Sequence, residues 1–334
     1  MNYTNSLQTD LINLIKNAKN IIISTHINPD GDGIGSMLAL YHYTTSLGAK
    51  VNCIINDFVP KNLKFLNGAS LIEQYSPSRH NNFFKKADLI IIVDLNDSSR
   101  LGDIEAPLSK STAYKIVIDH HTNPKDFANY YYIDTNSAAT GQLIWNLFQL
   151  DPEFELTKDI AEALYTAIVT DTGSFRYPRT NSSIHNIIAQ LIDAGADPTY
   201  LYDQIYNQSS FNVIKLLGIA LSNLKLAYDG RVCVMQISSN DFRDTSTNYK
   251  DTEFFVERTL SIEGVLVGVL ITEVLEKGII KISIRSKFDY DVASVAQMLG
   301  GGGHINAAGA TIKSLNLQTA TEAVIRQIGK LFEK

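Results

Sequence analysis

Three residues that can ligate a divalent cation lie within one short segment of the chain. His26, Asp30 and Asp32 belong to the sequence STHINPDGDGIGS, which directly follows an apolar run of three isoleucines. One imidazole and two carboxylates suit Mn²⁺, and Mg²⁺ less readily. Carboxylates two positions apart can diverge toward two ions. The alternative is an acidic, glycine-rich turn whose aspartates only cap the helix that follows.

Further acids and imidazoles follow other apolar segments. Asp94 lies near the end of LIIIVDL, while Asp119, His120 and His121 end YKIVIDHH. Asp171 follows an apolar stretch in AIVTDTGSFRY. A single aspartate in such a place is often a local turn residue. The carboxyl ends of parallel strands, however, meet at one edge of a sheet, so the sequence predicts one cluster there.

Together these side chains could hold two divalent ions about 3.5–4 Å apart, with one acid bridging them. A hydroxide between two such ions is a nucleophile at neutral pH and suits in-line attack on phosphorus. The predicted ligands are His26, Asp30, Asp32, Asp94, His120 and Asp171.

The segments that must position these residues alternate between helices and apolar strands. Strands are predicted at 21–25, 51–56, 89–95, 114–119 and 130–134, and helices at about 6–19, 34–47, 81–87, 137–149, 157–170 and 181–194. Continuous apolar strands that alternate with helices indicate an α/β fold, a doubly wound parallel sheet covered on both faces.

The second half of the chain has a different pattern. Strands are predicted at 231–237, 265–274, 279–286 and 310–313, with helices near 211–226, 251–261, 291–299 and 318–332. The polar and aromatic stretch between the halves is interpreted as a linker. The sequence therefore predicts a metal-binding domain (1–195), a linker (196–212) and a smaller α+β domain with a mixed sheet (213–334), with a cleft between the domains.

Composition narrows the class of protein. The chain has 334 residues, is 45% apolar and carries a net charge of −6. The acidic balance argues against binding to long duplex DNA, although short anionic substrates stay compatible with it. Cys53 and Cys233 lie in apolar runs and are expected to be buried, reduced thiols. No secretory leader or run of about 20 apolar residues is evident, so we expect a soluble cytoplasmic protein without membrane contact.

Four of these segments resemble the motifs of the DHH phosphoesterase superfamily, which includes RecJ-type exonucleases, family II inorganic pyrophosphatases and nanoRNase/pAp phosphatases. They are HINPDGDGIGS, VD at 93–94, DHH at 119–121 and TDTGSFRY, and none departs from the pattern. The resemblance implies two Mn²⁺ ions, with Mg²⁺ as the other candidate. One would be held by His26, Asp30 and Asp94, and the second by Asp32, Asp94, His120 and Asp171.

The same resemblance implies roles beside the metal ligands. His121 would contact the substrate phosphate, and Asp119 would orient a histidine. Together with the bridging Asp94, these are the expected catalytic residues.

The C-terminal half carries a second motif. ISIRSKFDYDVASVAQMLGGGGHINAAGA resembles the DHH-associated domain of the nanoRNase/pAp phosphatase branch. Arg285 could grip a terminal phosphate, and the amides of a loop over residues 300–303 could approach an anion or a base. A flexible hinge is the alternative for the glycines. The expected substrate-binding residues are Arg285, Ser286, Gly301, Gly302, Gly303 and His304, with Arg100 as a further candidate that could equally be a surface residue.

We therefore expect a Mn²⁺-dependent phosphoesterase that hydrolyses short oligoribonucleotides from the 3′ end and removes a phosphate from pAp, with a homodimer as the oligomeric form to be considered. One alternative is hydrolysis of cyclic di-AMP or its linear product pApA, which a similar branch performs. A second is a nucleotide-binding regulatory protein without catalysis, which would require lost ligands. Family II pyrophosphatase activity is disfavoured, because its second domain should offer a more strongly basic pocket.

Overall fold

The computed structural model describes residues 3–274, 276, 278–313 and 316–333, and the chain forms two compact units, Met1–Gln208 and Ser209–Lys334. This division differs from the predicted linker at 196–212. Pro198–Tyr206 form helix α8, and its Leu201 and Ile205 are buried in the core of the first unit. Polar and aromatic residues on the outer side of α8 concealed this helix in the sequence.

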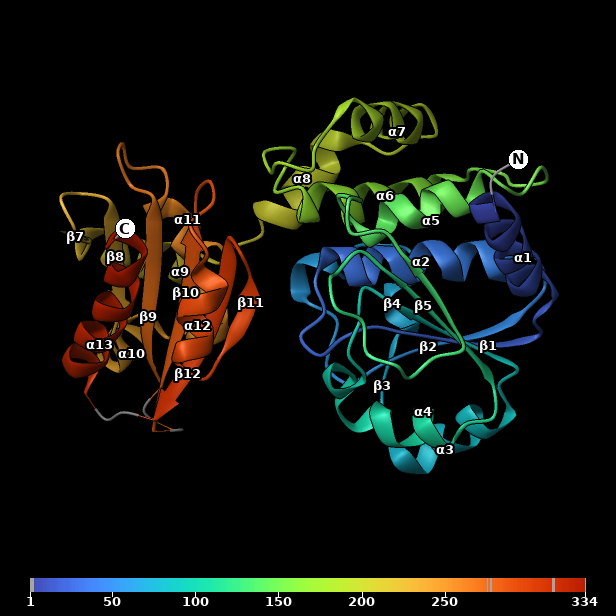
Figure 1. Ribbon diagram of the computed structural model, residues 1–334, viewed down its shortest axis with the longest axis horizontal. Coiled ribbons are helices and arrows are strands. Elements are labelled where there is room, and N and C mark those ends of the chain that lie inside the picture. The colour runs from blue at the N-terminus through green and yellow to red at the C-terminus, as the bar shows by residue number, and fades with distance from the viewer. Residues whose placement is uncertain (1–2, 275, 277, 314–315, 334) are drawn as a thin grey trace. The chain divides into compact units, whose positions relative to one another are not determined.

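The described residues of the first unit contain a six-stranded sheet in the order β3-β2-β1-β4-β5-β6 (Figure 1). All neighbouring strands are parallel, which confirms the predicted doubly wound sheet. The strands are β1 (Asn20–Ser24), β2 (Lys50–Ile55), β3 (Glu73–Gln74), β4 (Leu89–Val93), β5 (Tyr114–Asp119) and β6 (Tyr130–Ile133). The strand order reverses between β1 and β4, and such a switch point is where ligands bind in this type of sheet.

Helices cover both faces of this sheet, because the central strands β1, β4 and β5 are apolar on both sides. Ile21 and Ile23 face one core, whereas Ile22 between them faces the other. The first core is covered by α1 (Tyr3–Asn17), α2 (Gly31–Ser46), α5 (Thr140–Phe148), α6 (Lys158–Asp171), α7 (Ser182–Asp193) and α8, and the second by α3 (Pro77–Lys86) and α4 (Glu105–Lys110).

Helices α2 and α6 approach each other closely beside the sheet. A Cβ atom on Gly35 of α2 would lie 2.4 Å from the carbonyl oxygen of Ala163 in α6. Glycine at this position therefore brings the N-terminal half of α2, which carries Asp32, toward the C-terminal half of α6, which carries Asp171.

The second unit contains a mixed sheet in the order β11-β12-β10-β9-β8-β7, in which only β8 and β9 pair in parallel. Its strands are β7 (Lys225–Ala227), β8 (Val232–Ile237), β9 (Val267–Val274), β10 (Ile279–Ser286), β11 (Gly302–His304) and β12 (Ala307–Lys313). The glycine run was predicted to be a loop, but its second half forms β11, because Gly302 and Gly303 pair with Gly309 and Ala308 of β12.

The two faces of this mixed sheet pack against different helices. Val234 and Val269 face a core formed with α12 (Val292–Met298) and α13 (Leu317–Gly329). Met235 and Leu270 face the opposite side, which is covered by α9 (Phe211–Ser222), α10 (Ser239–Thr245) and α11 (Phe255–Thr259). Both cysteines are buried and free, as predicted. Among the described helices, none is long and apolar enough to span a bilayer.

Candidate functional site

The predicted metal ligands gather at the carboxyl ends of β1, β4 and β5, beside the switch point of the first sheet. His26 and Asp30 follow β1, Asp94 follows β4, and His120 follows β5. Asp171 reaches the cluster from the last residue of α6. Residues that are distant in the sequence are therefore brought together by parallel strands whose ends coincide.

The first group of ligand atoms belongs to His26, Asp30 and Asp94, which lie within 4.8 Å of one another. The Nε2 atom of His26 lies 3.3 Å from Oδ2 of Asp94 and 3.8 Å from Oδ1 of Asp30. Asp30 also caps α2, because its Oδ1 accepts from the backbone amides of Asp32 and Gly33. The capping interpretation and the metal interpretation of this turn are thus compatible with each other.

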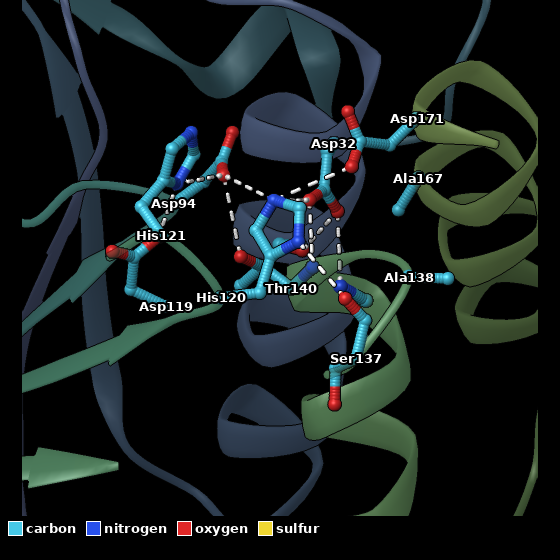
Figure 2. A network of polar contacts seen from close by, with 12 residues as sticks. Asp32, Asp94, Asp119, His120, His121, Ser137, Ala138, Thr140, Ala167 and Asp171 are labelled. Carbon is cyan, nitrogen blue, oxygen red and sulfur yellow. Dashed lines mark hydrogen bonds and ion pairs between the residues drawn. The ribbon is translucent and has the colours of Figure 1, made fainter. Parts of the chain in front are cut away.

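The second group belongs to Asp32, His120 and Asp171. Figure 2 shows the imidazole of His120 beside the carboxylates of Asp32, Asp94 and Asp171. Its Nε2 atom lies 3.8 Å from Oδ2 of Asp32, 3.7 Å from Oδ1 of Asp94 and 3.3 Å from Oδ2 of Asp171. Asp94 therefore lies beside both groups, with Oδ2 toward His26 and Oδ1 toward His120.

Backbone carbonyls fix the ring orientation of His26 and His120, the two histidines among the predicted ligands. Nδ1 of His26 donates to the carbonyl of Ile27, and Nδ1 of His120 donates to the carbonyl of Ser137. In the neutral form of each ring, Nε2 then carries the lone pair and faces the carboxylates. An outer hydrogen bond of this kind is typical of metal-binding histidines.

Asp119 and His121 form a separate pair at the edge of the cluster. Oδ1 of Asp119 accepts from Nδ1 of His121 at 2.7 Å, and the same nitrogen lies 3.6 Å from Oδ1 of Asp94. Asp119 is fully buried, and its Oδ2 atom has no hydrogen-bond partner among the described residues. The geometry agrees with Asp119 acting on His121 and not on a metal ion.

The cluster contains several buried carboxylates that an added positive charge would stabilise in their ionised form. Burial and the neighbouring carboxylates, Asp94 first among them, raise the pKa of Asp32 and of Asp171 well above the usual range. Burial opposes the charged form of His26, but the carboxylates of Asp30 and Asp94 outweigh it and raise its pKa to about 10. Burial lowers the pKa of His120.

This donor set fits hard or borderline divalent cations. Carboxylate oxygens and imidazole nitrogens are their ligands, and a cation would stabilise the ionised acids that otherwise repel one another. Asp30 has a half-exposed side chain, which leaves one side of the cluster open to solvent. The residues present can therefore hold divalent metal beside a position that a substrate can reach.

Sequence reasoning missed the contribution of α5. The amide of Thr140 donates to Oδ2 of Asp32 at 2.6 Å, and the amide of Gly141 donates to Oδ1 at 2.9 Å. The hydroxyl of Thr140 also donates to Oδ1 of Asp94 at 3.3 Å. A Cβ atom on Gly141 would lie 2.6 Å from Cβ of Ala167, so this approach requires glycine. A backbone donor does not depend on the residue type, which is why the sequence contains no signal for these two amides.

Two arginines lie close to the cluster. The carbonyl of Arg100 accepts from the amide of Ile27, and the positive charge of Arg100 opposes protonation of His121. Arg179, which sequence reasoning did not identify, lies with Nη1 3.5 Å from the carbonyl oxygen of Ser137, and its charge opposes the rise in the pKa of Asp171. Arg100 and Arg179 thus both lie near the predicted metal site.

A pocket of about 450 Å³ lies on the second sheet, over β10 and β12. Lys281, Ser283 and Arg285 alternate along β10, and their partners Thr311, Gly309 and Ala307 line the same face. Small side chains leave this part of the sheet open, and Gly300, Gly301 and Gly302 complete the lining. Arg285, Gly301 and Gly302, three of the predicted substrate-binding residues, thus line one pocket.

The remaining residues of the second motif have other positions. The hydroxyl of Ser286 is buried, donates to the carbonyl of Tyr290 and accepts from Nδ2 of Asn306, so it holds the loop after β10 instead of facing the pocket. Gly303 has a φ of +146° and forms part of the strand pairing with β12. The backbone of His304 ends β11, and its side chain lies outside the described part of the structure.

Comparison with known proteins agrees with this geometry. Residues 20–168 match the DHH family, N-terminal domain, and residues 229–330 match the DHHA1 domain. The chain is 32% identical to the bifunctional oligoribonuclease and PAP phosphatase NrnA of Thermus thermophilus, over 92% of this chain and 89% of that protein. It is 26% identical to the cyclic-di-AMP phosphodiesterase PdeA of Listeria monocytogenes, over 94% of this chain and 48% of that protein.

Among solved structures, the fold is similar to that of an exopolyphosphatase-related protein from Bacteroides fragilis. The two chains are 30% identical, have a TM-score of 0.91 and match over 98% of each. Both units of the chain therefore have counterparts in this relative.

Proposed function

The chain belongs to the DHH family, and on that premise we propose that it is a Mn²⁺-dependent phosphoesterase that hydrolyses short oligoribonucleotides and removes a phosphate from pAp. The observation that carries this proposal is the position of Asp94, whose two oxygens face two separate groups of ligands. One shared carboxylate is what a pair of closely spaced cations requires.

The distances around Asp94 support two ligand sets. The first cation would be held by His26, Asp30 and Asp94. The second would be held by Asp32, His120 and Asp171, together with Asp94. Two such ions supply a nucleophile at neutral pH and compensate charge on the attacking and leaving oxygens.

The other two residues of the cluster, Asp119 and His121, would position the substrate and transfer protons. His121 stands beside Asp94, and Asp119 holds its Nδ1 atom, so the ring would be oriented to act on a phosphate oxygen or a leaving group. The Asp119 carboxylate and its hydrogen bond favour the protonated form of His121, although burial opposes it. A protonated imidazole could donate to a phosphate oxygen and stabilise its charge.

The second unit would recognise the end of the substrate that is not cleaved. Arg285 and Lys281 give the pocket positive charge, and its floor of small residues lets a nucleotide approach the sheet closely. A pocket with only a few positively charged side chains suits a short substrate and not a long polyanion. Gly301 and Gly302 remain the proposed backbone contacts, with Gly303 and His304 as further candidates.

A substrate panel scored by chain length tests this function. RNAs of 2, 3, 5, 10 and 30 nucleotides and pAp are incubated with the full chain and Mn²⁺, and released mononucleotide is measured. We expect kcat/KM to be highest for the shortest RNAs and to fall by about tenfold or more for the 30-mer. Equal turnover of the 2-mer and the 30-mer would contradict the proposed preference. A label at the 5′ end then shows whether cleavage starts at the predicted 3′ end.

The relative PdeA motivates a second candidate, hydrolysis of cyclic di-AMP or of pApA. A cyclic dinucleotide has no terminal phosphate for Arg285 to bind. If cyclic di-AMP is nevertheless cleaved faster than pApA and pAp in the same panel, the second candidate replaces the first. A non-catalytic nucleotide-binding protein would hydrolyse none of them, but the six predicted metal ligands that such a protein would lose are all present here.

Manganese, the cytoplasmic location and the homodimer are further parts of the proposal. The mixture of two imidazoles with carboxylates favours Mn²⁺ over Mg²⁺, which prefers oxygen ligands. Titrating the metal-free chain with each ion checks this preference. Cell fractionation checks the location, and sedimentation equilibrium reports whether the mass is once or twice that of the chain.

A further inference from the structure

Arg285 is only partly free to bind an anion. Its Nε atom donates to Oε1 of Glu257 at 3.0 Å, and its Nη1 atom donates to the carbonyl of Ile284 at 3.1 Å. The other terminal nitrogen has no hydrogen-bond partner among the described residues, and 29% of the side chain is exposed at the pocket. Two of the three guanidinium nitrogens thus bind within the protein, while the remaining terminal nitrogen keeps donors for a ligand.

Glu257 is held firmly in place opposite Arg285. It belongs to α11, whose Phe255 and Val256 are buried in the core beneath the helix. The helix lies directly on β9, because a Cβ atom on Gly268 would meet the hydroxyl of Thr259 at 1.8 Å. The ion pair therefore does not have the mobility of an ordinary surface pair.

The two carboxylate oxygens of Glu257 have different surroundings. Oε2 is buried and lacks a hydrogen-bond partner among the described residues. A buried carboxylate oxygen without a donor costs stability, so this arrangement needs a reason other than packing. Its negative charge lies against the same guanidinium that lines the anion pocket.

We propose that Glu257 is a positioning residue that orients Arg285 toward the pocket and, through its charge, limits how tightly the pocket holds a phosphate. This inference rests on the proposed function, in which Arg285 contacts a terminal phosphate. The carboxylate fixes the Nε atom of the guanidinium and directs the remaining terminal nitrogen to the ligand. It also repels the phosphate, which keeps a mononucleotide product weakly bound and free to leave.

Two substitutions separate orientation from charge. Glu257→Gln keeps an oxygen that can accept from Nε of Arg285 but removes the charge, whereas Glu257→Ala removes both. In the full chain with Mn²⁺, we expect Glu257→Gln to lower the Kd of AMP by about fivefold and Glu257→Ala to raise the KM of pApA by about tenfold. Neither variant should change the KM of ApA, which lacks a terminal phosphate. Glu263→Gln, an exposed glutamate close by in the chain, is the matched control.

The outcomes distinguish this inference from the function on which it rests. If the wild-type chain hydrolyses pApA but Glu257→Gln binds AMP no more tightly, or if both variants affect pApA and ApA equally, Glu257 has only a structural role and the inference is wrong. If the wild-type chain neither binds nor hydrolyses these nucleotides, the proposed function fails and the role of Glu257 toward phosphate fails with it. Urea unfolding of both variants shows whether a loss arises from stability alone.

Discussion

The Nε2 atom of His26 lies 3.3 Å from Oδ2 of Asp94, although the two residues follow different strands, β1 and β4. The backbone of Asp94 is left-handed, with a φ of +57°. Aspartate and asparagine adopt this conformation more readily than other residues with a side chain. The turn after β4 thereby directs the carboxylate of Asp94 between the two groups of ligands. Asp94 is therefore the first residue whose replacement should affect activity.

Replacing Asp94 by asparagine should abolish hydrolysis while preserving the fold. Asparagine tolerates the left-handed backbone, and it removes the charge that both cations would share. We expect kcat for pApA to fall by at least about 10³-fold, with an unchanged far-UV circular dichroism spectrum. Asp229→Asn is a matched control, because Asp229 is also left-handed, with a φ of +55°, and is exposed in the other unit. Turnover by Asp94→Asn at the wild-type rate would rule out the shared-carboxylate mechanism.

In the metal-free chain, stability should fall as the pH rises. The pKa of His26 is raised to about 10 by Asp30 and Asp94 against the effect of burial, so its contribution is fully present below about pH 6.5 and is lost toward pH 10. Asp32 and Asp171 act in the same direction, because burial and nearby carboxylates raise their pKa and make ionisation unfavourable above about pH 4. Urea unfolding at pH 6, 7, 8 and 9 measures this slope, which His26→Gln should reduce.

Binding of Mn²⁺ should then release protons and reverse the loss of stability. A metal ion needs the neutral imidazole of His26 and ionised carboxylates, so it must displace the protons that the metal-free cluster retains. Calorimetric titration at pH 7.5 in buffers of different ionisation enthalpy should report a net release of protons. Affinity that does not change between pH 6 and 8.5 would contradict the assignment of His26 as a ligand.

Much of the cluster of carboxylates and imidazoles could be predicted because each candidate ligand follows an apolar segment, and strands of one parallel sheet end at a common edge. Asp94 after β4 and His120 after β5 are examples. The amides of Thr140 and Gly141 could not be predicted, because a backbone donor has no residue type. The ion pair between Glu257 and Arg285 could not be predicted either, because it depends on how closely α11 packs on Gly268, which is a tertiary contact.

Replacing glycine by alanine should have opposite effects on stability at two positions, one where helices α2 and α6 pack closely and one on an open helix surface. Gly35→Ala should destabilise the first unit by about 1–3 kcal/mol, because the new methyl group would meet the backbone of Ala163 and separate the helices that carry Asp32 and Asp171. Gly218→Ala in α9 should instead stabilise the second unit by about 1 kcal/mol, because no atom lies within 4 Å and alanine favours the helix. Urea denaturation measures both changes. Equal effects at the two positions would contradict the close packing.

A matched pair in the glycine run tests the pocket of the second unit. A Cβ atom on Gly301 would lie 2.1 Å from the carbonyl oxygen of Gly309, so Gly301→Ala should displace β12 and lower stability. Gly302 lines the same pocket, but nothing lies within 4 Å of the position of its Cβ atom. Gly302→Ala should therefore fold with wild-type stability, yet its methyl group would occupy space that the ligand needs. We expect the KM of pApA to rise by about tenfold, at an unchanged kcat, because uniform binding is lost. A Gly302→Ala variant with wild-type KM would show that the substrate does not approach this strand.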